Sequence, residues 1–145
     1  WYWEQLFPAS EEITVEHSYH PGTGGSVDSG LSIPEFRDSE WGQQMIADYC
    51  VDRNFLAGLE RMRSSGRYIA IGERVLTYIL TTGANWRAPI GDFRLVVDKG
   101  EPENLVSFCA EGVRKIGPTQ FEVRHRNWRP DRDLRVLILV PYGEQ

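Results

Sequence analysis

Three carboxylates and one tryptophan in the second half of the chain are the side chains best suited to catalysis or ligand binding. Asp92, Asp98 and Glu111 lie at predicted strand ends or in loops, where two carboxylates held together could serve as general acid and general base. Nothing in the sequence brings two of them together, so we expect surface carboxylates and no catalytic residue. Trp86, in the segment GANWRAP, either caps the core, which we favour, or offers a stacking surface to a ligand. Trp86, Asp92 and Glu111 are the candidate ligand-binding residues.

The three histidines do not form a recognisable metal site. His17 and His20 are three residues apart in a predicted strand, so their imidazoles point to opposite faces and cannot share an ion. His17 and His125 each lie on the apolar face of a predicted strand, where a hydrogen-bonded core histidine is the commoner role. We expect no bound metal and no cofactor.

Residues 21–34, PGTGGSVDSGLSIP, are rich in glycine and serine and predict a long, mobile loop. A phosphate-binding loop would continue into Lys-Ser or Lys-Thr and a helix, and neither follows here. A serine nucleophile at Ser26 or Ser29 would call for the G-x-S-x-G pattern, which is absent. We expect a loop without chemistry.

Cys50 and Cys109 are the only cysteines in the sequence. In a cytosolic protein two distant cysteines are usually small core hydrophobes, whereas in an exported protein the simplest role for such a pair is a disulfide. A redox site is disfavoured because the two do not form a C-x-x-C motif. We favour a disulfide that ties a helical insertion to a core strand, with free thiols as the alternative. In the chain-entropy model such a long closed loop stabilises a fold by about 4 kcal/mol.

Composition and charge indicate an ordinary globular domain. The 145 residues are 41% hydrophobic and 26% charged, with a net charge of −5, and a chain of this length can bury its own core. Arginines recur from Arg124 to Arg135, but Glu122, Asp131 and Asp133 are interleaved with them. We therefore expect a solvated face and no nucleic-acid partner. No apolar run is long enough for a membrane-spanning helix.

The hydrophobic pattern predicts a mainly β protein. Residues 12–20 alternate apolar and polar side chains, as a half-buried antiparallel strand does. The aromatic-rich residues 2–7 are expected to pair with them. Five further strands are predicted over residues 74–80, 93–97, 105–109, 119–126 and 134–140.

Two short helices are predicted between the second and third strands, over about residues 38–65. Asp38 or Ser39 can cap the first and Asp52 the second, and Gly66 suits the left-handed position that ends a helix. Apolar side chains recur at helical spacing in both, at Trp41, Met45 and Tyr49 in the first and at Phe55, Leu59 and Met62 in the second.

About seven strands with a two-helix insertion predict an antiparallel β-sandwich of immunoglobulin-like architecture. The sequence contains no internal repeat and no linker that would divide it. We therefore expect residues 1–145 to form a single domain.

Six segments taken together resemble one bacterial family. They are YWEQLFP, ITVEHSYHPGTGGS, YCVDRNFL, YILTTGANWRAPIGDFRLVVDKG, LVSFCAEGVRKIGPTQFEVR and PDRDLRVLIL, and they cover nearly the whole chain. This set resembles domain-of-unknown-function family 4424, a family of exported bacterial proteins. The fourth segment is the most specific of the six.

The resemblance implies a periplasmic or secreted location, which supports the Cys50–Cys109 disulfide. It also implies that this chain, which begins with WYW as if inside a strand, is the C-terminal part of a longer exported protein. It carries no catalytic residues to transfer. We expect a non-enzymatic binding or structural module of the bacterial envelope, with its own N-terminal region, another copy or an envelope protein as partner. The alternative is a hydrolase or carbohydrate-active domain that uses loop carboxylates beside Trp86.

Overall fold

The computed structural model of the chain describes Glu4 and residues 6–144. These residues form seven strands, three α-helices and two short 3-10 helices. In chain order the elements are β1 (Gly24–Ser26), η1 (Gly30–Ser32), α1 (Pro34–Asp38), α2 (Glu40–Asp48), α3 (Arg53–Ser64), β2 (Tyr68–Tyr78), η2 (Thr81–Asn85), β3 (Ile90–Asp98), β4 (Leu105–Phe108), β5 (Arg114–Lys115), β6 (Gln120–Trp128) and β7 (Leu134–Glu144). The prediction of a mainly β protein is confirmed.

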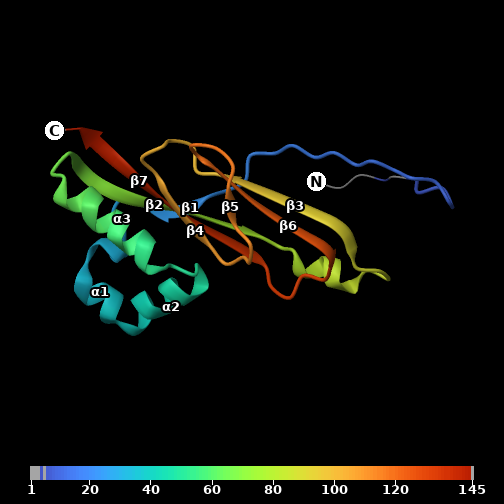
Figure 1. Ribbon diagram of the computed structural model, residues 1–145, viewed down its shortest axis with the longest axis horizontal. Coiled ribbons are helices and arrows are strands. Elements are labelled where there is room, and N and C mark those ends of the chain that lie inside the picture. The colour runs from blue at the N-terminus through green and yellow to red at the C-terminus, as the bar shows by residue number, and fades with distance from the viewer. Residues whose placement is uncertain (1–3, 5, 145) are drawn as a thin grey trace.

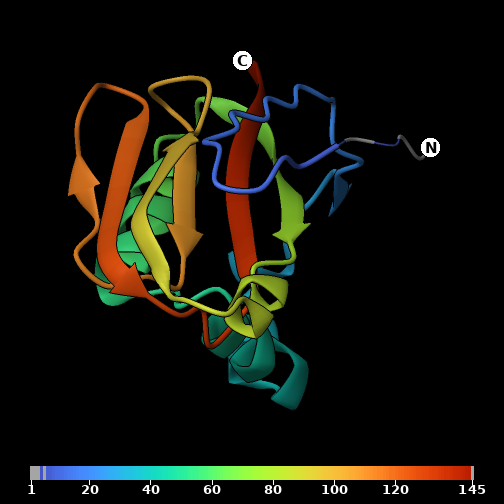
Figure 2. The same cartoon turned by 90° about the vertical axis from the view of Figure 1, so that its right-hand side faces the viewer.

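The strands form two antiparallel sheets (Figures 1 and 2). One sheet has the strand order β1-β2-β7-β4 and the other β3-β6-β5. The long strands β2 and β7 pair from Tyr68 opposite Glu144 to Tyr78 opposite Leu134, which makes them the backbone of the larger sheet. The helices gather at one end of the molecule, against the larger sheet (Figure 1).

Strand β7 contributes to two separate apolar cores. Side chains alternate between the two faces of a strand, and here Leu137 and Leu139, both 0% exposed, pack with the helices, whereas Val136 and Ile138 pack with the second sheet. The helix-side core also holds Leu31, Val51, Phe55, Leu59, Met62 and Ile71, and the sheet-side core holds Val97, Phe108 and Val123. A strand covered on both faces must be apolar on both, as LRVLILV is.

The helix caps follow the sequence prediction. Ser39 Oγ accepts a hydrogen bond from Gly42 N at 3.1 Å and Asp52 Oδ1 accepts one from Phe55 N at 2.7 Å, which begins α2 and α3. Gly66, with φ of +64°, takes the left-handed conformation after α3. Within the described residues, no helix has the length and apolarity that crossing a membrane requires.

The predicted apolar stripe of the first helix is wrong at Trp41, which is 80% exposed. An additional short helix, α1, explains this. Its Phe36 carbonyl comes so close to α2 that a Cβ atom at Gly42 would clash with it. The two helices therefore meet at Gly42, and the neighbouring Trp41 stays on the solvent side.

The predicted strand over residues 12–20 is also wrong. The segment belongs to neither sheet, and except for Ile13, which is half-buried, its side chains are exposed. Figure 1 shows it as a dark-blue arm that projects away from the helices. A strand needs a neighbouring edge for its backbone hydrogen bonds, and this segment pairs with no strand of either sheet. Of the predicted partner over residues 2–7, residues 2, 3 and 5 lie outside the described residues, and residues 4, 6 and 7 belong to neither sheet.

Residues 21–34 are more structured than predicted. They supply β1 and η1, and Ser29, 1% exposed, donates its hydroxyl to Glu73 Oε2 and its N–H to Ile71 O, both at 2.7 Å. The three α-helices therefore follow the first strand of the described chain and precede β2. The predicted number of two helices is corrected to three.

Candidate binding site

A cavity of about 420 Å³ lies where the β6–β7 loop, the start of β7 and the residues after β4 meet the inner face of β3 and β6. Small-molecule sites in proteins commonly have volumes of roughly 300–1,000 Å³. The lining combines apolar and aromatic side chains with several charged ones. It consists of Cys50, Leu80, Phe93, Leu95, Cys109, Ala110, Glu111, Val123, His125, Trp128, Arg129, Asp131, Arg132, Asp133 and Leu134.

Three aromatic rings form one wall of this cavity. Phe93 of β3 lies opposite His125 of β6 in the strand register, and cross-strand partners on one face are natural neighbours. The ring centroids are 4.5 Å apart for Phe93 and Trp128, 5.0 Å for His125 and Trp128, and 6.3 Å for Phe93 and His125. The wall therefore presents a continuous aromatic surface on the inner side of the second sheet.

The backbone at Asn127 explains how His125 and Trp128 come together. Side chains three residues apart on a regular strand point to opposite faces. Asn127 has φ of 50°, a left-handed conformation that asparagine tolerates better than most residues. This break in the alternation turns Trp128 to the same side as His125.

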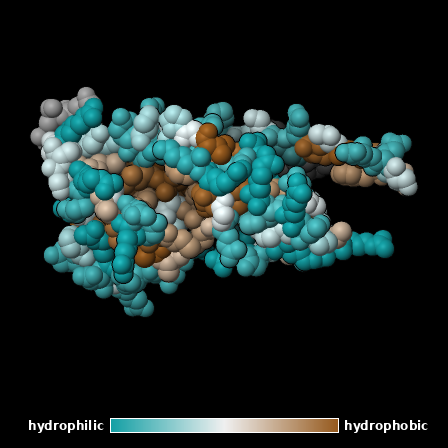
Figure 3. Space-filling view, in the orientation of Figure 1, coloured by the Kyte–Doolittle hydropathy of each residue, from teal (hydrophilic) through white to brown (hydrophobic). Residues whose placement is uncertain are grey.

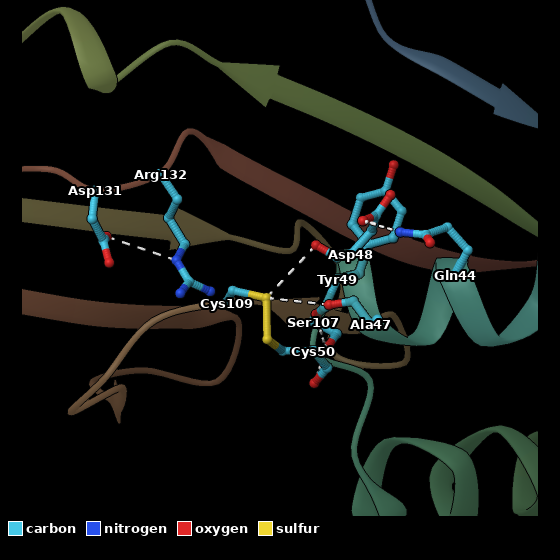
Figure 4. Close-up of a disulfide and its surroundings, with 9 residues drawn as sticks. All are labelled: Gln44, Ala47, Asp48, Tyr49, Cys50, Ser107, Cys109, Asp131 and Arg132. Atoms are coloured by element: carbon cyan, nitrogen blue, oxygen red, sulfur yellow. Dashed lines mark hydrogen bonds and ion pairs between the residues drawn. A yellow bond between two sulfur atoms is a disulfide. The ribbon is translucent and has the colours of Figure 1, made fainter.

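The disulfide between Cys50 and Cys109 forms another part of the lining (Figure 4). It joins the link between α2 and α3 to the residue after β4, with an S–S distance of 2.07 Å. Ser107 Oγ donates to Tyr49 O at 2.9 Å, and Arg135 NH1 donates to Asp48 Oδ2 at 2.6 Å. Three links, one of them covalent, thus fix the end of α2 against the larger sheet beside the cavity.

Asp133 fixes the end of β2 to the start of β7. Its Oδ1 accepts hydrogen bonds from Leu80 N at 3.0 Å and from Thr81 N and Oγ1 at 3.0 and 2.8 Å. The backbone and hydroxyl hydrogen bonds from Thr81 lead in lowering the pKa of Asp133 below its ordinary 3.8. The carboxylate is charged at neutral pH and is held by these donors.

Arg129 holds the loop that carries Trp86. Its guanidinium donates to Ala84 O at 2.9 Å, to Trp86 O at 3.0 Å and to Arg87 O at 3.3 Å. One guanidinium thereby fixes three backbone carbonyls in the segment that runs from η2 toward β3. The loop conformation therefore depends on a side chain that also lines the cavity.

Of the candidate ligand-binding residues, the cavity includes Glu111 and neither of the others. The prediction that Trp86 caps the core is wrong, because its side chain is 63% exposed. The loop instead packs through the buried Gly83, where a Cβ would lie 3.3 Å from Ile90 Cδ1. Asp92 is exposed on β3, and since it precedes Phe93 it points to the outer face of the sheet.

The outer face of the second sheet carries a cluster of charges centred on Glu122. This residue is 5% exposed. It accepts hydrogen bonds from Arg94 Nε at 2.7 Å and Arg114 NH2 at 2.6 Å, with Arg124 Nε at 3.3 Å. The hydrogen bonds from Arg94 and then Arg114 are the largest causes that lower the pKa of Glu122 from 4.5 to about 2. Part of the arginine-rich stretch is therefore engaged in an ion-pair network.

Two further ionisable groups stabilise the turn between β3 and β4. Asp98 accepts from Gly100 N at 2.9 Å, and this hydrogen bond leads in lowering the pKa of its carboxyl. Lys99, 9% exposed, donates to Pro102 O and Asn104 O at 2.6 and 2.5 Å, and burial lowers the pKa of its ammonium. Both shape the β3–β4 turn. Among the described residues no group of three or more His, Cys, Asp or Glu could hold a metal ion.

Several residues of the cavity were missed in the sequence. The aromatic wall combines residues from two strands with a break at Asn127, and Asp133 meets Thr81 across 52 positions. From composition alone, the segment NWRPDRDL (residues 127–134) is recognisable only as charged and turn-forming. A clue was available in its aspartates, which commonly accept backbone N–H bonds in turns.

Comparison with protein families adds one finding. A family model described as "Domain of unknown function (DUF4424)" matches residues 1–137. No curated protein and no solved structure matches the chain.

Proposed function

Since the chain belongs to the DUF4424 family, whose description names no activity, we propose a function from the cavity: a non-catalytic binding module that takes up a ring-bearing ligand. The aromatic wall of Phe93, His125 and Trp128 carries this proposal, because three contiguous rings offer one stacking surface. The ligand ring lies against that wall, inside a cavity of suitable size.

The charged lining supports binding better than catalysis. Asp133 is held by Leu80 and Thr81, and Arg129 by loop carbonyls. Asp131 and Arg132 are sequence neighbours that form an ion pair, with 3.7 Å between Arg132 Nε and Asp131 Oδ1. Glu111, which has an exposed side chain, is the carboxylate of the lining to which no such structural role is assigned. A single carboxylate can hydrogen-bond a hydroxyl or cationic group of the ligand and set its orientation.

A saccharide is the ligand class that fits this lining best. Sugar rings present C–H faces that pack on aromatic rings and hydroxyls that hydrogen-bond carboxylates and guanidinium groups. Figure 4 shows Arg132 extending toward the disulfide at the cavity, where its guanidinium can donate to hydroxyls. Glycans of the bacterial envelope are therefore the first compounds to test.

Location in the periplasm or outside the cell is part of the same proposal. The Cys50–Cys109 disulfide supports it, because such bonds persist in oxidising compartments, as does the resemblance to exported proteins. We also propose that the chain is the C-terminal part of a longer protein and that residues 1–145 are one domain. The shared core of Val97, Val123 and Val136 supports the finer architecture, an immunoglobulin-like β-sandwich.

The test is a titration of the isotope-labelled protein with chitotriose, a soluble glycan fragment, followed by NMR. The indole N–H of Trp128 and the amides of residues 109–111, 129 and 131–134 should shift in a saturable way. Glu111→Gln should weaken binding roughly ten-fold, the usual scale for a hydrogen bond to a charged group. Asp92→Asn is the matched control, because Asp92 lies outside the cavity, and it should leave affinity unchanged.

Saturable shifts confined to the Trp86 loop or to the outer face of β3 would move the site elsewhere. If neither chitotriose nor longer envelope glycans produce saturable shifts at the aromatic wall, the saccharide proposal fails.

Glycan hydrolysis is the second candidate, and one observation favours it. Glu111, Asp131 and His125 line the same cavity, and paired carboxylates with an imidazole could perform acid–base chemistry. Prolonged incubation of the same titration sample would reveal new reducing ends by NMR if the cavity is catalytic. Loss of that activity in Glu111→Gln, with unchanged thermal unfolding, would replace the binding proposal with the hydrolytic one.

A further inference from the structure

The second sheet has an open edge above an apolar groove. β3 pairs with β6 on one side and with no strand of the described chain on the other. Beneath this edge a groove of about 360 Å³ is lined mainly by apolar side chains of β3, β2 and β7. They include Leu76, Leu95, Val97, Leu134, Val136 and Ile138. An open edge above an apolar groove is a ready acceptor for another strand.

The outer edge of β2, in the larger sheet, is only partly covered by a neighbouring strand. β1 has three residues and covers β2 at Glu73, Arg74 and Val75. The next residues of β2, from Leu76 to Tyr78, pair with β7 but have no strand on their other side within the described sheets. The groove therefore opens between two incomplete edges.

The arm formed by residues 12–20 has the sequence of the missing strand. Its nine residues equal the length of β3, Ile90–Asp98. Ile13, Val15, His17 and Tyr19 lie on one side of the alternation, and Val15 and Tyr19 are 43% and 59% exposed. In the space-filling view apolar brown surface is visible along the projecting arm (Figure 3). Such a pattern is stable as a strand only where its apolar face is covered.

The charges of the arm restrict the register in which it could pair with β3. Residues 4–20 contain four glutamates and no lysine or arginine. On a strand added to β3, Glu12 and Glu16 would share the outer face with the exposed Arg94 and also with the exposed Asp92 and Asp98. Opposite charges on neighbouring strands favour pairing and like charges disfavour it, so a register that places a glutamate opposite Arg94 is preferred, and the apolar face of the arm supplies the match to the groove.

The link to β1 disfavours an arm that folds onto its own groove. Three residues, Pro21, Gly22 and Thr23, join the arm to β1, which is paired to β2 in the other sheet. Three residues span at most about 10 Å, roughly the separation of two facing sheets, which leaves none for a turn along β3. Pro21 also lacks the N–H that would extend β1 along β2. Figure 1 shows the arm running lengthwise past β3 toward the end of the molecule away from the helices, and it joins neither sheet.

We propose that the β3 edge accepts residues 12–20 of a second copy of this chain. Each copy donates its arm to the groove of the other, so the interface is reciprocal and closes as a dimer. Ile13, Val15 and Tyr19 of the donor cover the groove, while Glu12 and Glu16 lie on the outer face with Arg94. The edge and the apolar groove are then both covered.

Cross-linking between two differently tagged copies tests this directly. One copy carries Thr14→Cys on the polar side of the arm, and the other carries Val96→Cys on the outer side of β3. A disulfide-linked heterodimer whose joined peptides contain residues 14 and 96 is expected, with Glu12→Cys, Glu16→Cys and Ser18→Cys covering other registers. Ile69→Cys, at a position 71% exposed on β2, is the control that should not link. A single chain that carries both Thr14→Cys and Val96→Cys provides the opposing test. An internal link in that chain, with none between copies, would assign the arm to its own groove and overturn the proposal.

Light scattering across a concentration series gives the second measurement. The unaltered chain should form a dimer whose population rises with concentration. Val15→Asp should weaken dimerisation at least ten-fold, because a carboxylate would enter the apolar groove, whereas Thr14→Asp makes the same change on the solvent side and should have little effect. A monomer at every concentration, or equal loss from both variants, contradicts the proposal. Circular dichroism of both variants separates lost dimerisation from lost folding.

Discussion

The carboxylate of Asp133 accepts hydrogen bonds from both the backbone N–H and the hydroxyl of Thr81, at 3.0 and 2.8 Å. This contact joins the end of β2 to the start of β7 and holds the first turn of η2. We expect Asp133→Ala to release that turn and to accelerate hydrogen exchange at the amides of Leu80 and Thr81. Asp131→Ala, two residues earlier in the same loop and 75% exposed at its side chain, should leave both exchange rates unchanged. Equal exchange in the two variants would contradict this role.

Acid should weaken the fold through Glu122. Its pKa is about 2 in the folded chain against an ordinary 4.5, so the folded state favours the charged carboxylate. This stabilisation is fully present above pH 4.5 and is lost as the pH falls toward 2. The free energy of unfolding, measured by urea at several pH values, should therefore differ between the unaltered chain and Glu122→Gln most at pH 6 and least near pH 2. A difference that is independent of pH would contradict the ion-pair network.

Removing the disulfide should lower the free energy of unfolding by about 4 kcal/mol, from the loop of 59 positions that it closes. The double variant Cys50→Ser, Cys109→Ser isolates this effect without a free thiol. Urea unfolding in oxidising buffer measures it, and the reducing agent alone should reproduce it in the unaltered chain. Mass spectrometry of non-reduced peptides provides the chemical check, since Cys50 and Cys109 should appear as one joined pair.

Leu137→Ala should lower the free energy of unfolding by about 2–5 kcal/mol, the range for a fully buried leucine replaced by alanine. Leu137 is 0% exposed and lies in the helix-side core. Ile69→Ala, at a side chain that is 71% exposed on the neighbouring strand, should cost less than about 0.5 kcal/mol. Thermal unfolding followed by circular dichroism compares the two, and similar losses would argue against the core assigned here.

Releasing Arg129 should loosen the Trp86 loop. Arg129→Ala removes a guanidinium that donates to three loop carbonyls, so hydrogen exchange over residues 83–90 should become faster. Arg132→Ala, which removes a guanidinium from the same cavity without contact to these carbonyls, is the matched control. If both variants leave exchange unchanged, the loop is held by its packing at Gly83 instead.

The sequence predicted those parts of the fold whose signals are local. Ser39 and Asp52 cap helices through hydrogen bonds three residues along, and the strands from β2 onward arise from runs of apolar and β-branched residues. β5, with two residues, was missed because so short a strand exists only through its pairing with β6.

The aromatic wall and the arm show why other parts could not be predicted. His125 was assigned correctly to the inner side of a strand, but its contact with Phe93 depends on the β3–β6 register, and its contact with Trp128 depends on the left-handed backbone at Asn127. Neither is encoded in a local pattern. Residues 12–20 illustrate the converse case, because a strand pattern states what the segment can pair with and leaves open which edge receives it.

The position of β7 in the chain sets the order of events during synthesis. Both apolar cores close on this strand, and it follows every other described element in sequence. Until the segment around Leu137 has left the ribosome, the helices and the second sheet have no common surface to fold upon. A nascent chain that ends before Leu134 would therefore expose the apolar sides of both layers at once, and would be a substrate for chaperones rather than a partly finished domain.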